Sequence, residues 1–394
     1  MKYYPIKLNL EGIKKVLSGE LWLTLKDTLE GQILREKIEP GTLVTLLSKE
    51  GHFLAQAYFN PNVYYAIKIL STKEVSIDKE FFKNVFIKAL EIRKRFYPGE
   101  EVFRLIHGEG DYLPGLIIDI YKEFAVLQFH TLGIEKLKNE IVEALKESLP
   151  FLKGLVLKND FEKRKEENLS QYVEFLGSFK EDPLLVEMDG IKFLIPLERG
   201  QKTGFFLDQR ENRRLVMRIA RDLIIVDGFS YLGGFSFYAL KGGAKRAYLI
   251  DRSSFALDLA LEIAKINGFK NKVIPVEGDV FQILKNPPTE GDILILDPPA
   301  FIKAKRDKPR GIKKYEELYN LGLNFFKDRG GFLFLFSCSH FLTIEEQKYL
   351  VKKLLATKNL KARILYHLFQ APDHPINPTV EETEYLKGLL LRIN

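Results

Sequence analysis

Apolar and polar positions follow different patterns in three parts of the chain. Up to about residue 71, short apolar runs separated by turn residues predict a compact β-barrel, the last of its strands at 64–70. In the middle part, apolar positions recur at helical spacing over 78–95, and further strands and a helix follow. In the last part, apolar runs of strand length alternate with helical segments. We therefore predict three domains: a β-barrel over 1–71, an α+β domain over 72–181 and an α/β domain over 182–394.

The alternation in the last part predicts a doubly wound, mostly parallel sheet, because five or more strands alternate with helices after residue 222. In such a sheet, ligands bind outside the carboxyl ends of the strands. Residues able to do chemistry follow the apolar runs at these ends: Asp227, Asp251, Asp279, Asp297 and Cys338. The sequence therefore predicts one site along this edge of the sheet.

A turn of small residues follows the first of these strands and contains Phe229, Ser230 and Gly233. Its spacing differs from the G-x-G-x-x-G pattern of nicotinamide dinucleotide sites, and the sequence has no G-x-x-x-x-G-K-[ST] triphosphate loop. The acid, small and aromatic residues suit a neutral nucleoside with a charged amino-acid tail, and Asp251 is placed for its ribose hydroxyls. The alternative is that Asp251 only caps the next helix.

The segment from Asp297 to Phe301 reads Asp-Pro-Pro-Ala-Phe. Its two prolines stiffen the backbone where the chain leaves the sheet, so the Asp297 side chain is expected in the crevice. This segment resembles one in nucleic-acid methyltransferases, where it holds a flipped or single-stranded base. Pro298, Pro299 and Phe301 are therefore candidate contacts for a base.

Cys338 is the only cysteine. It follows the end of an apolar run and stands between Ser337 and Ser339. A lone cysteine is most often a small buried apolar residue, and this alternative remains open. With Asp297 expected across the cleft, the setting favours a nucleophile. Addition of the thiolate to C6 of a cytosine would let C5 accept a methyl group, while Asp297 could bond the N3/N4 edge. The sequence identifies no base for the C5 proton; His340 could lower the thiol pKa or serve only as a surface residue.

Charge adds an expectation about partners. The net charge of +7 and pI of about 9.0 permit a polyanionic partner. Residues 303–314 carry seven basic side chains and one acidic one beside the expected site, and a helix is expected only from Tyr315. This run is either a mobile solvated loop or a contact for phosphates, with Lys303, Lys305, Arg306 and Arg310 as candidates. The mixed-charge run 162–167 is expected to be solvated surface.

The cysteine count and the apolar runs bear on location. One cysteine excludes an intrachain disulfide and favours a reducing compartment. The N-terminus has no signal-peptide pattern, and no apolar run reaches the roughly 18 residues that a membrane helix needs. We therefore expect a soluble, cytoplasmic protein that binds no metal.

Several motifs together resemble a known family. The segments 19–22, 40–44 and 57–62 resemble a PUA domain, an RNA-binding module. With them, the whole chain resembles the PUA-containing cytosine-C5 methyltransferases of large-subunit (23S) ribosomal RNA. The motifs that carry this resemblance are 108–116, Lys202 to Arg213 (K-T-G-F-F-L-D-Q-R-E-N-R), 229–235, 251–257, 297–301, 337–339 and 371–375.

The resemblance implies a Rossmann-like class I methyltransferase domain that uses S-adenosylmethionine. It implies that Asp251 binds the ribose and Asp279 the adenine, and that Cys338 is the nucleophile. Ala300 stands where some other RNA cytosine methyltransferases carry a second cysteine, so product release would proceed without one. The remaining residues implied near the cofactor are Lys202, Phe206, Arg210, Asp227, Phe229, Ser230, Gly233, Ser253 and Asp297.

Two other functions remain open from the sequence. One is methylation of another base, such as a guanine nitrogen, with Cys338 structural. The other is a non-catalytic RNA-binding or ribosome-assembly factor that retains the cofactor fold. The sequence fixes neither the target nucleotide nor the oligomeric state, and a homodimer is compatible with it.

Overall fold

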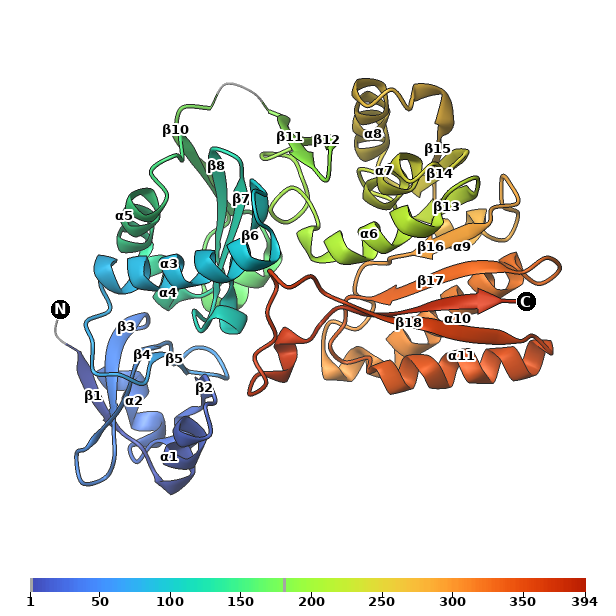
Figure 1. Ribbon diagram of the computed structural model, residues 1–394. Coiled ribbons are helices and arrows are strands. Elements are labelled where there is room, and N and C mark those ends of the chain that lie inside the picture. Colours follow the sequence, from blue (N-terminus) through green and yellow to red (C-terminus); the bar gives the residue numbers. More distant parts are fainter. Residues whose placement is uncertain (1–2, 180–181) are drawn as a thin grey trace. The chain divides into compact units, whose positions relative to one another are not determined.

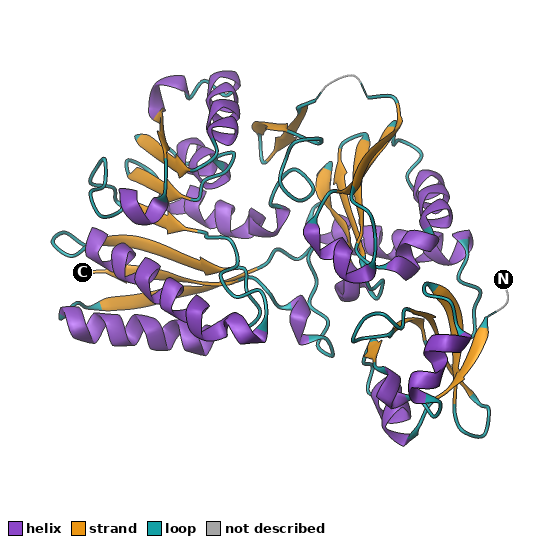
Figure 2. Cartoon of the chain, turned by 180° about the vertical axis from the view of Figure 1, so that it is seen from behind, coloured by secondary structure: helices purple, strands orange, loops and turns teal. Residues whose placement is uncertain are grey.

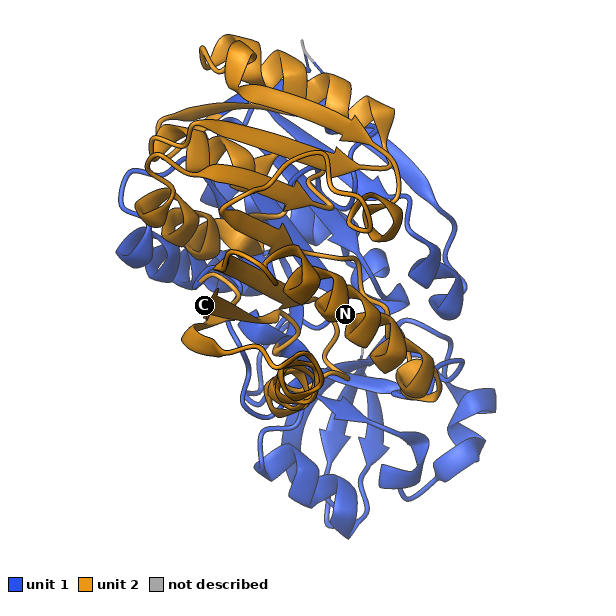
Figure 3. Cartoon of the chain, turned by 90° about the vertical axis from the view of Figure 1, so that its right-hand side faces the viewer, with its two compact units in different colours: residues 1–186, 195–205, 372–383 blue, residues 187–194, 206–371, 384–394 orange. Residues whose placement is uncertain are grey.

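The computed structural model describes residues 3–179 and 182–394. It consists of two compact units, each built from segments that are distant in the sequence (Figure 3). Unit 1 comprises Met1–Val186, Ile195–Phe205 and Pro372–Thr383, and unit 2 comprises Glu187–Leu194, Phe206–Ala371 and Glu384–Asn394. The finer division into three domains, with boundaries near residues 71 and 181, stays a prediction.

A five-stranded sheet of order β1-β3-β4-β5-β2 forms the first part of unit 1 (Figure 1). Apolar side chains such as Ile6, Leu23 and Phe59 fill its core. Strand β5 begins at Ile67 rather than at the expected position 64, because the N–H of Asn60 donates to the carbonyl of Ala66 and closes a loop. The elements are β1 (Tyr4–Lys7), α1 (Leu10–Leu17), β2 (Trp22–Leu23), η1 (Leu25–Asp27), η2 (Gly31–Ile33), α2 (Leu34–Lys37), β3 (Thr42–Leu47), β4 (Phe53–Phe59) and β5 (Ile67–Ser71).

A second five-stranded sheet of order β10-β9-β8-β7-β6 lies in the same unit and packs against helices, as the α+β pattern predicts. Asp78 starts the long helix of this part, because its carboxylate accepts the N–H of Phe81. The elements are α3 (Lys79–Phe96), β6 (Val102–His107), η3 (Gly108–Asp111), β7 (Leu116–Tyr121), β8 (Phe124–Phe129), α4 (Leu132–Lys136), α5 (Lys138–Ser148), β9 (Gly154–Asn159), η4 (Glu162–Glu167) and β10 (Tyr172–Gly177).

The mixed-charge run 162–167 is exposed at four of its six residues, as the sequence predicts, but its other two residues are buried. It forms the 3-10 helix η4, whose i,i+3 spacing places Arg164 and Glu167 on one inward face. The Arg164 side chain is 1% exposed and donates to the carbonyl of Phe129 and the carboxylate of Glu135. The prediction is wrong for these two residues because charge pattern alone does not show a buried ion pair.

The segment Pro372–Thr383 leaves unit 2 and belongs to unit 1. The Asp373 carboxylate accepts the N–H of Arg104 at 3.0 Å, and its carbonyl accepts Arg93 Nη2 at 3.0 Å. Further along, Thr379 Oγ1 donates to the carbonyl of Gly19 at 2.8 Å, and Val380 is part of the core of the first sheet. Residues near the end of the chain therefore complete both parts of unit 1.

Unit 2 is built on a seven-stranded sheet of order β15-β14-β13-β16-β17-β19-β18, which confirms the doubly wound prediction (Figure 2). The five strands from β15 to β17 are parallel, and β19 is antiparallel to both of its neighbours. Right-handed crossovers that change direction at β13 place α7 and α8 on one face and α9 and α10 on the other. The strands are β13 (Ile224–Gly228), β14 (Arg246–Asp251), β15 (Val273–Glu277), β16 (Ile293–Leu296), β17 (Gly331–Ser337), β18 (Ala362–Phe369) and β19 (Lys387–Ile393).

The predicted hairpin around Asp189-Gly190 is present, and both turn residues have positive φ (52° and 69°) as a tight hairpin turn requires. Its strands are β11 (Leu184–Met188) and β12 (Ile191–Ile195). The helices that follow are η5 (Leu207–Gln209), α6 (Arg210–Ile219), α7 (Gly234–Lys241), α8 (Ser254–Ile266), η6 (Lys270–Lys272), α9 (Val280–Ile283), η7 (Lys305–Asp307), α10 (Lys308–Phe325), α11 (Ile344–Lys358) and η8 (Glu381–Thr383).

Helix α10 begins at Lys308, earlier than the expected Tyr315. Pro309 stands in its first turn, where a missing N–H costs no intrahelical bond. The second half of the basic run 303–314 is therefore helical rather than a loop.

Among the described residues, no helix is both long enough and apolar enough to cross a lipid bilayer.

Asp227 ties β13 to the start of α7. Its Oδ2 accepts the N–H of Ser236 at 3.2 Å and the hydroxyl of Ser236 at 2.7 Å. The side chain is almost completely buried, and this burial raises the pKa of Asp227 to about 7. The ionised form is therefore disfavoured in the folded protein.

Replacing Arg164 with Met should lower the urea midpoint of unit 1. The change leaves Glu135 without its buried partner, a loss that typically costs about 3–5 kcal/mol. Fluorescence of Trp22, the only tryptophan, reports this unit because its Nε1 donates to Glu109 at 3.1 Å. Lys165→Met is the matched control, since Lys165 pairs with Glu162 on the exposed side of the same short helix. Equal midpoints for the two variants would contradict the assignment.

The stability of unit 2 should depend on the ionisation of Asp227. An aspartate in an unfolded chain has a pKa of about 3.9, so between this value and about 7 the folded state binds the proton more tightly. The free energy of unfolding should therefore fall as pH rises through this window, by up to roughly 1.4 kcal/mol per pKa unit. Asp227→Asn cannot ionise, so unfolding midpoints of wild type and variant should diverge between pH 4 and 7. Parallel pH profiles would refute this prediction.

Candidate active site

The strand order of the seven-stranded sheet reverses at β13, which lies between β14 and β16. Ligand-binding crevices form at such a point, between loops that leave neighbouring strands in opposite directions. Here the turn 229–233 follows β13, and the segment 297–301 follows β16. Since β17 is parallel to β16, the residue after β17, Cys338, lies at the same edge.

The structure brings Cys338 and Asp297 together. Cys338 Sγ lies 3.7 Å from Asp297 Oδ1, within the range of a weak sulfur hydrogen bond, and both side chains are half-buried. A thiol and a carboxylate therefore face the same space at the carboxyl edge. This is the arrangement that a nucleophile and an acceptor for one substrate would need.

Two serines fix the loop that carries Cys338. Ser337 Oγ donates to Tyr315 Oη of α10 at 2.9 Å, and Ser339 Oγ donates to the carbonyl of Ile302 at 2.6 Å. Burial raises the pKa of Tyr315 to about 12, so its phenol is neutral at physiological pH. The thiol is therefore held between two anchored residues, one fixed to the following helix and one to the segment after β16.

Gln209 holds the other oxygen of Asp297 and is itself held by Asn212, two roles that the sequence pattern does not indicate. Gln209 Nε2 donates to Asp297 Oδ2 at 3.0 Å, and Asn212 Nδ2 donates to Gln209 Oε1 at 2.6 Å. Asn212 also donates to the carbonyl of Phe369 at 3.0 Å. Because Asn212 occupies the amide oxygen of Gln209, the amide nitrogen must face Asp297. The carboxylate is thus oriented with Oδ1 toward Cys338.

The turn after β13 has an unusual backbone. Phe229, Tyr231 and Gly233 have φ of 63°, 49° and 74°. A Cβ on Gly233 would lie 2.6 Å from Leu249 Cδ2, so this position requires glycine. The buried Ser230 Oγ has no hydrogen-bond partner among the described residues. The turn therefore presents an unsatisfied hydroxyl, as a site for a polar ligand would.

Asp251 joins this turn to the next helix. Its Oδ2 accepts the N–H of Tyr231 at 2.8 Å, and its Oδ1 accepts the N–H of Ser253 at 2.9 Å. Each carboxylate oxygen can accept a second bond, and the side chain is only half-buried. Asp251 can therefore hold the turn and still receive ribose hydroxyls. Together with Ser230, it fits the nucleoside part of a cofactor such as S-adenosylmethionine.

Three other residues with an expected cofactor role carry structural bonds. Asp227 bonds to Ser236, as described above. Ser253 Oγ caps α8 by accepting the N–H of Ala256 at 3.2 Å. Asp279 caps α9 through Gln282 and forms an ion pair with Arg252. Helix capping accounts for the position of Ser253 and Asp279 without a ligand, so their cofactor roles stay predictions.

The remaining residues expected near the cofactor are Lys202, Phe206 and Arg210, and they belong to different units. Lys202 belongs to unit 1, whereas Phe206 and the buried Arg210 belong to unit 2. The Phe206 ring meets the Tyr231 ring edge-on at 5.5 Å, which places it beside the glycine turn. Their cofactor roles stay predictions.

The residues expected to contact RNA differ in how accessible they are. Phe301 packs on Tyr315 at 4.8 Å, and Lys314 Nζ lies 4.3 Å from the centre of the Phe301 ring, so this ring is partly covered. Pro298 is buried. The exposed candidates are Pro299, Lys303, Lys305, Arg306 and Arg310.

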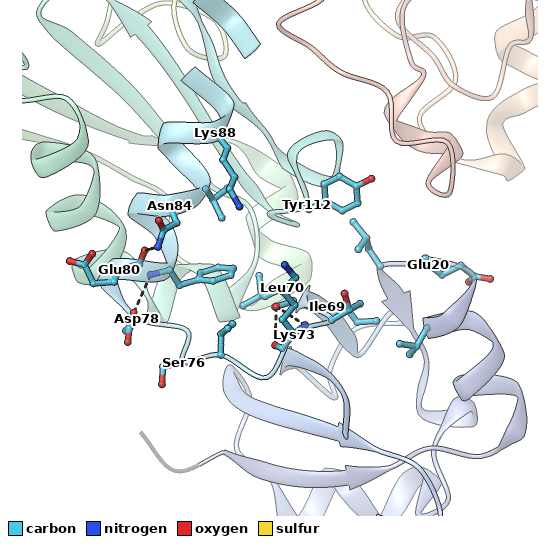
Figure 4. Close-up of a pocket in the computed structure, with 18 residues that line it drawn as sticks. Glu20, Ile69, Leu70, Lys73, Ser76, Asp78, Glu80, Asn84, Lys88 and Tyr112 are labelled. Carbon is cyan, nitrogen blue, oxygen red and sulfur yellow. Dashed lines mark hydrogen bonds between the residues drawn. The ribbon is translucent and has the colours of Figure 1, made fainter. Parts of the chain in front are cut away.

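A cavity of about 790 Å³ lies elsewhere, in unit 1, between the first sheet and α3 (Figure 4). Leu21, Ile69 and Phe81 line it together with charged side chains of both signs, such as Glu20 and Lys88. It contains none of the residues placed at the carboxyl edge of the seven-stranded sheet. In the part of the chain that the structure describes, no three His, Cys, Asp or Glu side chains gather as metal ligands would.

Comparison with known proteins agrees with this geometry. Residues 6–72 match the family of PUA-like domains, and residues 154–323 match the S-adenosylmethionine-dependent methyltransferase family. The solved structure of SMU.776, described as a methyltransferase and crystallised with SAH, superposes with a TM-score of 0.83 at 24% identity over 100% of both chains. At this identity the likeness supports the fold alone. It agrees with the α/β class predicted from the sequence.

Relatives of similar length share more of the sequence. Ribosomal RNA large subunit methyltransferase I of Alteromonas mediterranea is 34% identical over 371 residues, which are 91% of this chain and 92% of that protein. The protein of the same name from Vibrio parahaemolyticus is 33% identical over 90% of this chain and 91% of its own length. The chain is thus an S-adenosylmethionine-dependent methyltransferase with a PUA-like domain, and it belongs to the ribosomal RNA large subunit methyltransferase I family.

Proposed function

We propose that this protein transfers a methyl group from S-adenosylmethionine to C5 of a cytosine in large-subunit ribosomal RNA. The observation that carries the chemistry is the 3.7 Å approach of Cys338 Sγ to Asp297 Oδ1 at the edge where the parallel strands end. The names of the relatives support the ribosomal RNA substrate.

The thiol and the carboxylate have complementary roles in this reaction. C5 of cytosine is a poor nucleophile, so the Cys338 thiolate first forms a bond to C6 and moves electron density to C5. Asp297 accepts a hydrogen bond from the exocyclic amine of the base and holds the ring against the thiol. S-adenosylmethionine supplies the methyl group when it is bound. Loss of the C5 proton to a base then breaks the C6–S bond, and Cys338 returns as a thiolate.

Preorganisation of Asp297 supports this assignment. Gln209 fixes Oδ2, which leaves Oδ1 directed at the space shared with Cys338. An acceptor that is already oriented does not have to be ordered when the base arrives, so its contribution to the transition state is larger. The buried Gln209–Asn212 pair therefore contributes to catalysis through Asp297.

The cofactor is best accommodated at the turn after β13. Asp251 has lone pairs left for ribose hydroxyls, and Ser230 Oγ is unsatisfied. We assign Asp279 to the adenine on the resemblance to the family, with its helix cap retained.

Basic side chains beside the thiol suit the RNA backbone. Lys303, Lys305, Arg306 and Arg310 are exposed on the stretch that leads from the Asp297 segment into α10. Binding through phosphates makes affinity fall steeply with salt. A nucleophilic thiol must also stay reduced, which favours the cytoplasm, where ribosomal RNA is present. A homodimer remains compatible with the proposal.

RNA that contains 5-fluorocytosine should trap the enzyme. Fluorine at C5 cannot leave as a proton, so after methyl transfer the bond between Cys338 and C6 should persist as a complex stable in denaturing gels. Wild type should form this complex only with S-adenosylmethionine present, and Cys338→Ala should not form it. A fully active Cys338→Ala enzyme would overturn the thiol mechanism and favour methylation at another base, such as a guanine nitrogen.

Asp251→Ala should weaken S-adenosylmethionine binding about ten- to a hundredfold, because hydrogen bonds to a charged group are worth about 1.5–3 kcal/mol. Titration calorimetry measures this change directly. Asp258→Ala is the matched control, since Asp258 is an exposed acid on α8, one helical turn beyond the cap. Wild type that binds RNA but no S-adenosylmethionine would instead identify a non-catalytic RNA-binding factor.

A further inference from the structure

We propose that Tyr315 is a positioning residue for methyl transfer. Its buried hydroxyl holds Ser337, and through Ser337 the neighbouring Cys338 thiol, at the separation from Asp297 that the reaction needs. This inference rests on the proposed function in taking Cys338 as the nucleophile. It assigns a role to a residue that the sequence marks only as the expected start of a helix.

Tyr315 belongs to the apolar stripe with which α10 packs on the seven-stranded sheet. The buried positions of this helix recur at helical spacing, and Tyr315 is completely buried among them. It shares a core with Leu296, the last residue of β16, and with Leu335 of β17. The helix therefore places a phenol against the two strands that lead to Asp297 and Cys338.

The Tyr315 hydroxyl is bonded to both segments that carry the reacting groups. Ser337 Oγ donates to Tyr315 Oη at 2.9 Å, and the N–H of Phe301 donates to the same oxygen at 3.5 Å, a longer and weaker bond. Ser337 directly precedes Cys338, and Phe301 ends the segment that begins with Asp297. One oxygen atom is therefore the common acceptor for the thiol segment and the carboxylate segment.

Further bonds tie the two segments to each other. Ser339 Oγ donates to the carbonyl of Ile302 at 2.6 Å, and the N–H of Ser339 donates to Ser337 Oγ at 3.3 Å. The segment 297–301 contains two prolines, whose fixed φ angles stiffen its backbone. The 3.7 Å separation of thiol and carboxylate is therefore set by the bonds of their neighbours, which are stronger than the sulfur hydrogen bond itself.

Tyr315 acts through Ser337 and not on the substrate. Successive residues of a strand direct their side chains to opposite faces, so Ser337 turns to α10 and the next side chain, Cys338, turns to Asp297. Burial raises the pKa of Tyr315 to about 12, so the phenol stays neutral around physiological pH. Loss of its hydroxyl should therefore slow the reaction by the same factor at each pH, unlike loss of a group that exchanges a proton.

Tyr315→Phe tests the hydroxyl alone, because the ring can keep its packing on Phe301 at 4.8 Å. We expect kcat to fall about ten- to a hundredfold, since a misplacement of about 1 Å can cost a hundredfold in rate. KM for RNA and calorimetric binding of S-adenosylmethionine should stay unchanged, whereas a merely structural role would impair them as well.

Tyr319→Phe is the matched control. Tyr319 lies one turn further along α10 and is as deeply buried, but its hydroxyl has no hydrogen-bond partner among the described residues. Its removal should leave kcat unchanged. A wild-type kcat in Tyr315→Phe, or an equal loss in Tyr319→Phe, overturns the proposal.

Ser337→Ala makes the test specific, because it removes the bond between the two hydroxyls from the other side. Tyr315→Phe should slow Ser337→Ala by clearly less than it slows wild type, since the shared bond is already missing. Losses that multiply in full overturn the proposal. If Tyr315→Phe does not fold, Ser337→Ala must itself show a lowered kcat with unchanged KM, and a wild-type kcat in this variant overturns the proposal.

Alkylation of Cys338, the only cysteine, separates this proposal from the proposed function. At a pH where the thiol is ionised, its rate of reaction with iodoacetamide, followed by the mass of the intact protein, reports how firmly the thiol is held. Tyr315→Phe should react severalfold faster than wild type and Tyr319→Phe. If Cys338→Ala is fully active, the proposed function fails and alkylation decides alone: a faster rate supports the positioning role, and an unchanged rate overturns it.

Discussion

The different lengths of two neighbouring strands determine the site. Strand β16 ends at Leu296, whose partner on β17 is Leu335, but β17 continues to Ser337. Its last two residues are paired with β19 instead, as Phe336 with Gly388 and Ser337 with Lys387. This extension carries Cys338 beyond the end of β16, where the chain turns at Asp297.

Close packing at Gly388 allows that extension. A Cβ at this position would lie 2.6 Å from the carbonyl oxygen of Leu335, so only glycine lets β19 come close enough to β17. The antiparallel β19 is therefore more than an added edge to a parallel sheet. It pairs with the last residues of β17, which carry the thiol.

The features that the sequence predicted correctly are those that depend on the local pattern of apolar residues. Alternating apolar runs fix the doubly wound sheet, and with it the common edge at which Asp227, Asp251, Asp297 and Cys338 stand. The Gln209–Asp297 bond joins residues 88 positions apart and leaves no periodic trace. The side on which β19 pairs is likewise not shown by the sequence pattern. Arg164 was misjudged for the same reason: its burial depends on carbonyl and carboxylate groups that only the folded chain brings to it.

The segment Pro372–Thr383 also bears on how the molecule is made. Val380 fills the core of the first sheet, and Asp373 satisfies Arg93 and Arg104, so unit 1 lacks part of its interior until the ribosome has synthesised nearly the whole chain. A PUA-like domain at the front of a protein would ordinarily fold during translation and could be expressed alone. Here its final packing is post-translational, and a truncated product that lacks the C-terminal segment leaves the PUA-like part of the protein incomplete as well as the methyltransferase part.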